Sequence, residues 1–245
     1  MADLQTYSWD SIYESQPSTN GSHLVDEFYV PALERSVRYD RVAGYFSSSA
    51  LAVASRGVHA LVENDGQMRL IVGAELYETD RPVLEALSEE LSEDLDELED
   101  ERLDAHLQLL AQLLRENRLN IKVAVPRQGN WGIFHPKVGI FHDDQDNSLS
   151  FEGSVNETAG GWERNYERFK VHREWREGQR EYVEADVHTF DRLWDNDHTY
   201  VEVYDLPKAI EEEIIDWNAP DSDTEINKAI QIARGDAPLT ERDKA

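Results

Sequence analysis

The stretch at residues 133–171, IFHPKVGIFHDDQDNSLSFEGSVNETAGGWERNYERFKV, decides the fold and carries most of the recognisable chemistry. Its opening run, 133–141, alternates apolar with other residues, which predicts a β-strand. Residues two apart on a strand share a face, so we expect His135 and Lys137 to project together. Pro136 removes a hydrogen-bond donor between them, which indicates a strand edge or a bulge at this point.

Two further strands are expected behind the first. A polar turn at 143–147 leads into a second strand at 148–151, and this strand leads into a turn that contains Gly153, Ser154, Val155 and Asn156. A loop of small residues then leads to a third strand near 166–171. That strand is expected to hold Asn165 and Glu167, another pair two residues apart.

These groups together suit phosphoryl chemistry. Lys137, Ser154, Asn156 and backbone N–H groups are all donors for phosphate oxygens. His135 beside them can act as a nucleophile or as an acid and base. Glu167 can hold the second imidazole nitrogen and so fix the tautomer. The residues therefore predict phosphoryl transfer without an obvious metal cage.

The combination HxK, then GSxN sixteen residues later, then NxE resembles the phospholipase D superfamily. The upstream text EFYVPALERSVRYDRVAGYFSSSAL and GQMRLIVG is similar to phospholipase D-like domains found with prokaryotic helicases and restriction or defence systems. The resemblance spans roughly 24–204. One feature departs from it, because His142 occupies the slot of the family's Asp and Asp143 follows one position later.

The resemblance implies a two-step mechanism without metal or cofactor. His135 would attack phosphorus and form a phosphohistidine intermediate, while a second histidine protonates the leaving oxygen and then activates water. Lys137, Gly153, Ser154 and Asn156 would hold the phosphoryl oxygens, with Glu167 orienting His135 and Asn165 completing the pocket. The chain has one HxK motif where the mechanism needs two, so we expect a homodimer that pairs two copies of His135.

Charge is distributed unevenly along the chain. Asp and Glu number 51 against 24 Lys and Arg, giving a net charge of -27, and only six residues are Lys. This composition is typical of a halophile's surface, and it disfavours nucleic-acid binding through charge alone. Residues 118–180, however, hold ten basic and nine acidic residues, so the rest of the chain carries -28. That contrast indicates a phosphate-binding face.

Upstream of the motifs, helical and strand patterns alternate. Helices are predicted at 24–38 and 50–63, and strands at 41–46, 68–72 and 120–125. Between them, residues 78–117 predict an inserted acidic helix or helical hairpin, with a leucine stripe under a solvated face. The expected fold class is α/β, a phospholipase D-like fold whose mixed, mostly parallel sheet has helices on both faces.

The domain organisation expected is an N-terminal arm at 1–22, the phospholipase D-like domain at 23–205, and a C-terminal helix and polar tail at 206–245. The chain has no cysteine, so disulfides and thiolate metal sites are excluded. It shows no apolar run of membrane-spanning length and no signal peptide, so we expect a cytoplasmic protein without a membrane partner.

Alternatives remain open. His142 with Asp143 and Asp144 could indicate a metal site, although strand alternation points His142 away from His135.

The first function expected is a nuclease acting on DNA or RNA in defence or repair, with a helicase as partner. The second is a catalytically weak nucleic-acid-binding module of a helicase system. A lipid phosphodiesterase is the third, disfavoured because no basic amphipathic stretch is present.

Overall fold

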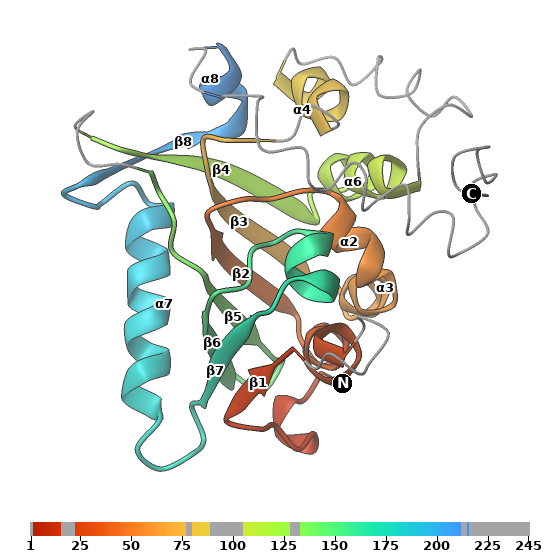
Figure 1. The fold of residues 1–245 in the computed structure, drawn as a ribbon, viewed down its shortest axis with the longest axis vertical. Coiled ribbons are helices and arrows are strands. Elements are labelled where there is room, and N and C mark those ends of the chain that lie inside the picture. Colours follow the sequence, from red (N-terminus) through yellow and green to blue (C-terminus); the bar gives the residue numbers. More distant parts are fainter. Residues whose placement is uncertain are drawn as a thin grey trace.

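The computed structural model describes residues 2–15, 23–76, 80–88, 105–127, 133–211 and 215. Within them the chain forms a mixed α/β domain around one eight-stranded sheet of order β1-β7-β6-β5-β2-β3-β4-β8. The strands are β1 (Ile12–Glu14), β2 (Arg38–Ala43), β3 (Gln67–Gly73), β4 (Leu119–Pro126), β5 (Val138–His142), β6 (Ser148–Gly153), β7 (Arg168–Arg173) and β8 (Val201–Asp205). Helices cover both faces of this sheet (Figure 1).

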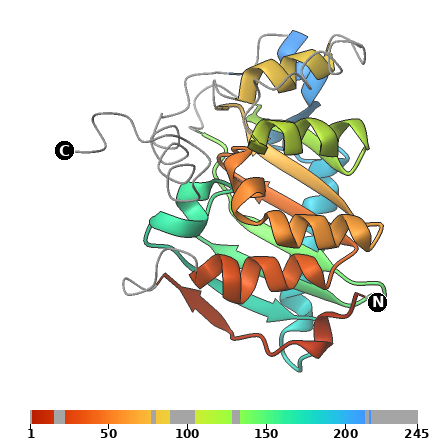
Figure 2. The same cartoon turned by 90° about the vertical axis from the view of Figure 1, so that its right-hand side faces the viewer.

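One face of the sheet carries a layer of several helices, and the opposite face carries α7 (Arg180–Trp194) (Figures 1 and 2). The elements in or near the first layer are η2 (Val25–Tyr29), α1 (Val30–Glu34), α2 (Ser49–Val53), α3 (Ser55–Glu63), α4 (Arg81–Ser88) and α6 (Ala105–Arg115). Three short helices complete the described set: η1 (Leu4–Thr6), η4 (Gly160–Arg164) and α8 (Leu206–Glu211).

The sheet is mostly antiparallel, so the predicted mostly parallel sheet is wrong. Only the pairs β2/β3 and β3/β4 run parallel, whereas the pairs β1/β7, β2/β5, β4/β8, β5/β6 and β6/β7 run antiparallel. The helical crossovers that enforce parallel pairing lie only between β2 and β4. The motif strands β5 and β6 are joined by a short turn, which pairs neighbours antiparallel.

The main core lies between the sheet and the larger helical layer. Large aromatic side chains fill its centre, and Phe28 contacts Phe151 edge-on with ring centroids 5.1 Å apart. Trp162 stacks on Tyr29 at 4.1 Å. A smaller core under α7 includes Phe190 and other apolar residues. Burial of this aromatic area is the largest favourable term holding the sheet to its helices.

Residues 2–15, predicted as part of an arm that docks on the body, are built into the domain. β1 pairs with β7 at the sheet edge, and Trp9 and Tyr13 are buried in the main core. Tyr13 stacks on Phe169 with centroids 5.5 Å apart. The aromatic rings of Trp9 and Tyr13 explain why this otherwise polar segment packs on the domain, since each ring buries a large apolar area.

Within the predicted acidic insert at 78–117, the structure describes two helices, α4 and α6. Most of the acidic run itself, residues 89–104, lies outside the described residues, as does most of the predicted tail at 206–245. Among the described residues, no helix is long and apolar enough to cross a membrane.

Candidate active site

The motif residues meet at one edge of the sheet. β2, β3, β4 and β6 end there, and β5 and β7, which run the other way, begin there. The loops after β2 and β6 are tied together, because the backbone N–H of Ser47 donates to the carbonyl of Glu157 at 2.9 Å. Loops at such an edge are free to carry chemistry on a rigid scaffold.

His135 and Lys137 precede their strand instead of lying in it. β5 begins at Val138, and residues 133–137 are irregular, so the predicted strand start at 133 is wrong. The reason is a lost partner, because Val138 pairs with Val42 and β2 ends at Ala43. Pro136 also removes the N–H that a longer ladder would need.

His135 packs against the chain just beyond β2. A Cβ atom at Gly44 would lie 2.4 Å from its Nδ1 atom, so Gly44 is required for this close approach. The ring of Tyr45 meets the imidazole edge-on, with centroids 5.4 Å apart and planes at 77°. His135 is thus held in place while its side chain remains exposed to solvent.

The electrostatics of His135 favour its neutral form. Partial desolvation lowers the pKa of His135, and the charge of Lys137 lowers it further, while Glu75 opposes the shift. A neutral imidazole is the form that can attack phosphorus. Sequence reasoning missed Glu75 and Tyr45. Their available signal was position, since both directly follow the carboxyl ends of parallel strands.

Lys137 is the cation of the motif and interacts electrostatically with His135 and Glu167. Its Nζ atom donates to the carbonyl of His135 at 3.2 Å. Desolvation lowers the pKa of Lys137, and the charge of Arg41 acts the same way, while Glu167 raises it. The ammonium therefore interacts with both predicted catalytic groups.

Glu167 forms the other half of the site together with Ser154. The Ser154 hydroxyl donates to the Glu167 carboxylate and accepts from the backbone N–H of Arg168 at 3.1 Å. Asn165 and Glu167 precede β7, which begins at Arg168, so their predicted place on the strand is wrong. Within the described part of this chain no hydrogen bond joins Glu167 to His135. Its orienting role stays a prediction.

Asn156, Gly153 and Asn165 are positioned mainly through the backbone. The Oδ1 atom of Asn156 accepts from the backbone N–H of Tyr45 at 3.3 Å, which leaves its Nδ2 atom as the donor for a ligand. A Cβ atom at Gly153 would lie 2.3 Å from the carbonyl oxygen of Arg168, so the turn needs glycine. Asn165 is exposed and ends η4, with its N–H bonded to Gly160 at 2.8 Å.

A buried ion pair supports the turn at 154–156 from inside. Arg41 Nε donates to the Glu157 carboxylate at 2.9 Å, with both side chains fully buried. The Nη2 atom of Arg41 donates to the backbone carbonyl of Val155. The hydroxyls of Tyr29 and Tyr39 also donate to Glu157. Burial raises the pKa of both phenols well above its usual value, and the charge of Glu157 raises it further. Sequence reasoning missed this cluster.

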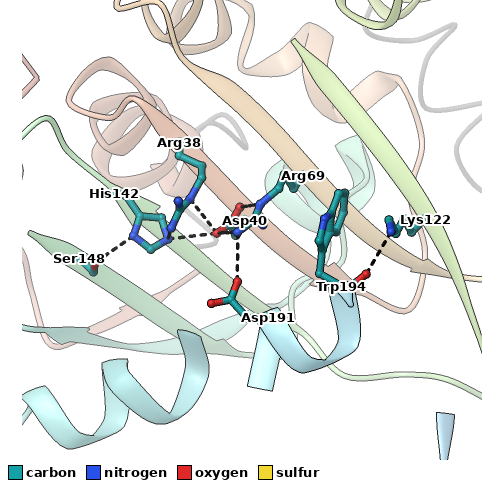
Figure 3. Close-up of polar contacts among 8 residues, drawn as sticks. All are labelled: Arg38, Asp40, Arg69, Lys122, His142, Ser148, Asp191 and Trp194. Atoms are coloured by element: carbon teal, nitrogen blue, oxygen red, sulfur yellow. Dashed lines mark hydrogen bonds and ion pairs between the residues drawn. The ribbon is translucent and has the colours of Figure 1, made fainter. Parts of the chain in front are cut away.

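The residues of the alternative metal site form hydrogen bonds with other parts of the protein. His142 Nε2 lies 3.1 Å from Asp40 and its Nδ1 lies 2.9 Å from Ser148 (Figure 3). The Asp143 carboxylate accepts the backbone N–H of Leu4 at 2.9 Å. Both lie at the far end of β5, roughly 15 Å from the motif edge by strand rise. Asp143 therefore organises a turn and does not reach Lys137.

Comparison with known proteins finds similarity only to solved structures. No family model and no curated protein matches the sequence. NucT from Helicobacter pylori aligns at 12% identity and a TM-score of 0.44, over 78% of this chain and 97% of its own. Nuc from Salmonella typhimurium, a phospholipase D family member, aligns at 15% and 0.44, over 76% and 94%. Yeast tyrosyl-DNA phosphodiesterase aligns at 12% and 0.41, over 66% and 31%. Likeness at this level carries no argument about activity, substrate or assembly.

Proposed function

We propose that the protein is a metal-independent phosphodiesterase, a nuclease that cleaves DNA or RNA through a phosphohistidine intermediate. The observation that carries the proposal is the set of groups at one sheet edge, where Lys137 interacts with both His135 and the Ser154–Glu167 pair. These groups include a nucleophile, a cation and oxygen-binding donors, as phosphoryl transfer requires.

The steps follow from the chemistry of these groups. An imidazole nitrogen of His135 bonds to phosphorus as the phosphorus–oxygen bond to the leaving group breaks. A proton must reach that leaving oxygen, and we assign its delivery to the His135 imidazolium of a second copy in a homodimer, so that one copy is neutral and the other protonated at the start. Water then attacks phosphorus, gives its proton to that second imidazole and releases the first His135. Lys137 and Asn156 stabilise the charge on the phosphoryl oxygens.

The biological setting proposed is defence, restriction or repair, in the cytoplasm of a halophile and with a helicase partner. This part rests on the sequence resemblance and on the acidic, Lys-poor composition. The second candidate is a nucleic-acid-binding accessory module without catalysis. The observation favouring it is that His135 and Glu167 share no hydrogen bond within the described part of one chain.

The test is a cleavage assay on single- and double-stranded DNA in EDTA, at low and molar salt. We expect the wild type to cleave and His135→Ala to lose at least about 10²- to 10⁴-fold in rate, the range for general acid–base catalysis, because the variant lacks the nucleophile as well. His59→Ala is the matched control, because His59 is 75% exposed on α3. Cleavage lost in EDTA would point to a metal. No cleavage by a folded dimer would favour the accessory module.

A further inference from the structure

A cavity of about 500 Å³ opens beside His135 between the sheet and α7. His135 and Pro136 form part of its wall, and Phe190 and Leu193 of α7 face them across the space. Lys137 does not line it. The cavity therefore adjoins the reactive imidazole without including the lysine expected to bind phosphate. A nucleobase occupies only a fraction of such a volume, and pockets of this size commonly hold small ligands.

The lining of the cavity selects against anions. Its floor is apolar, with Val42 and Phe134, while Glu152 and Asp186 bring two carboxylates to its wall. Burial raises the pKa of Asp186, and the charge of Glu152 raises it further. A phosphate would be repelled here, whereas a flat apolar ring that donates hydrogen bonds would be favoured.

The rim offers an aromatic surface. Tyr200 lines the cavity and is 63% exposed, and its ring lies 6.3 Å from that of His198. An exposed aromatic next to an apolar cavity is suited to stacking of a second ring.

The α7 wall is anchored, so the cavity does not depend on a ligand to form. Arg69 donates to Asp40 at 2.7 Å and reaches Asp191 of α7 at 3.4 Å (Figure 3). The Arg69 guanidinium also lies 4.8 Å above the ring of Phe190. Lys122 holds the helix end, 3.0 Å from the carbonyl of Trp194 and 4.7 Å from its ring centroid.

The net negative charge of the chain explains why binding of a base would matter for affinity. At -27 the chain gains little affinity for nucleic acid from phosphate contacts. Stacking and burial of a base persist at high salt, because they do not depend on counterion release. A cavity for a base would supply affinity where the electrostatic contribution fails.

We propose that this cavity binds one unstacked nucleobase bearing an exocyclic amino group, next to the scissile phosphate of a single-stranded nucleic acid. The proposal rests on the proposed function, since it names the substrate class of the same site. The apolar walls cover the ring, and Asp186 or Glu152 accepts from the amino group. A base within a duplex is stacked and paired, so single strands are the substrate.

The test measures binding rather than cleavage. The His135→Asn protein is titrated in EDTA with fluorescent octamers of deoxycytidine, of thymidine and of an abasic backbone, at low and molar KCl. We expect the deoxycytidine octamer to bind roughly tenfold more tightly than the abasic octamer, with thymidine between them. Thr189→Trp, which fills the cavity from α7, should remove this preference. Glu181→Trp, on an exposed position of the same helix, should keep it.

Equal affinity for deoxycytidine and abasic octamers, absence of binding, or a preference that survives Thr189→Trp would overturn the proposal. Equal affinity for deoxycytidine and thymidine would overturn its amino-group part. Wild-type cleavage of the same octamers is measured in parallel. Cleavage without base preference would contradict the proposal of base binding in the cavity and leave the proposed phosphodiesterase activity standing. Base preference without cleavage would contradict the phosphodiesterase activity and leave base binding standing.

Discussion

Asp40 and Arg41 are neighbours on β2, yet their side chains enter two charge clusters on opposite faces of the sheet. The site cluster, Arg41 with Glu157, Tyr29 and Tyr39, is fully buried beneath the turn at 154–156. The helix cluster, Asp40 with Arg38, Arg69 and His142, lies on the α7 face, where the side chains of Arg38, Arg69 and His142 are 35%, 17% and 12% exposed.

The difference shows how one strand supports two tasks. The side chains of the site cluster are not exposed to solvent, and Nη1 of Arg41 already has no hydrogen-bond partner among the described residues. The helix cluster can rehydrate its cations when a contact breaks. We therefore expect changes in the site cluster to cost more stability and to reach the catalytic edge, while changes in the helix cluster affect α7 and its cavity.

The largest effect expected is on Glu157→Gln. It leaves Arg41 buried without a counter-charge, which should lower the free energy of unfolding by about 3–5 kcal/mol. Urea unfolding at constant high salt measures this. The double variant Arg41→Leu/Glu157→Leu should lose less than the single one, because no lone charge remains. If Glu157→Gln lowers the free energy of unfolding no more than the exposed control Glu177→Gln does, the expected difference between the site cluster and the helix cluster is contradicted.

A smaller loss is expected on the other face. Asp40→Asn should lower the free energy of unfolding by about 1–3 kcal/mol, since the cations it leaves can reach water. At temperatures where the variant is folded, its cleavage rate at saturating substrate should equal that of the wild type, because the change reaches only α7 and the cavity. A rate loss comparable to that of His135→Ala would show that the helix cluster also serves the chemistry.

The pH dependence of stability should separate the clusters further. Burial alone would raise the pKa of Asp40, but hydrogen bonds with Arg69 and His142 lower it below its usual value. A lowered folded-state pKa means that Asp40 contributes stability above its unfolded pKa and loses it as the pH falls through the folded pKa. The stability gap between wild type and Asp40→Asn should therefore shrink in acid. A gap that widens in acid contradicts this assignment.

The smallest effects expected are shifts in the pKa of His135. Lys137→Gln should raise it and Glu75→Gln should lower it, because the two charges act in opposite directions. Titration of the imidazole by nuclear magnetic resonance gives both signs in one experiment, with His59 as an internal reference. Shifts of the same sign in both variants would show that the three side chains are not arranged as described.

Much of the fold could be predicted from the sequence. Helical and strand patterns upstream of residue 126 predicted β3 and β4 within two residues of their bounds, because amphipathic periodicity is local. The helix predicted at 24–38 ends at Glu34, and the strand predicted at 41–46 lies at Arg38–Ala43 as β2. Pairing direction is not local. The antiparallel sheet follows from the short β5–β6 turn and from β1 crossing to β7, and no periodicity in the strands encodes it.

The candidate site could be predicted in its residue types but not in all its contacts. The fold brings the motif residues His135, Lys137, Ser154 and Glu167 to one edge of the sheet, and their roles stay predictions. The strand assignments of His135, Lys137 and Glu167 were wrong because the partner strands β2 and β6 end beside these residues. The position of Glu75 after β3 was a sequence signal that it lies at the carboxyl edge of the sheet, but its contact with His135 depends on how β3 and the segment before β5 pack, which the sequence does not show.

The measurement that tests the central claim most directly is a search for the covalent intermediate. Wild type and His135→Ala are mixed with a phosphorus-labelled oligonucleotide in EDTA, quenched in alkali within one turnover, and digested for mass spectrometry. The proposed mechanism predicts a phosphorus adduct on the peptide at His135 of the wild type and none in the variant. Cleavage in EDTA with no adduct on the wild type, or with the adduct on another residue, would contradict it.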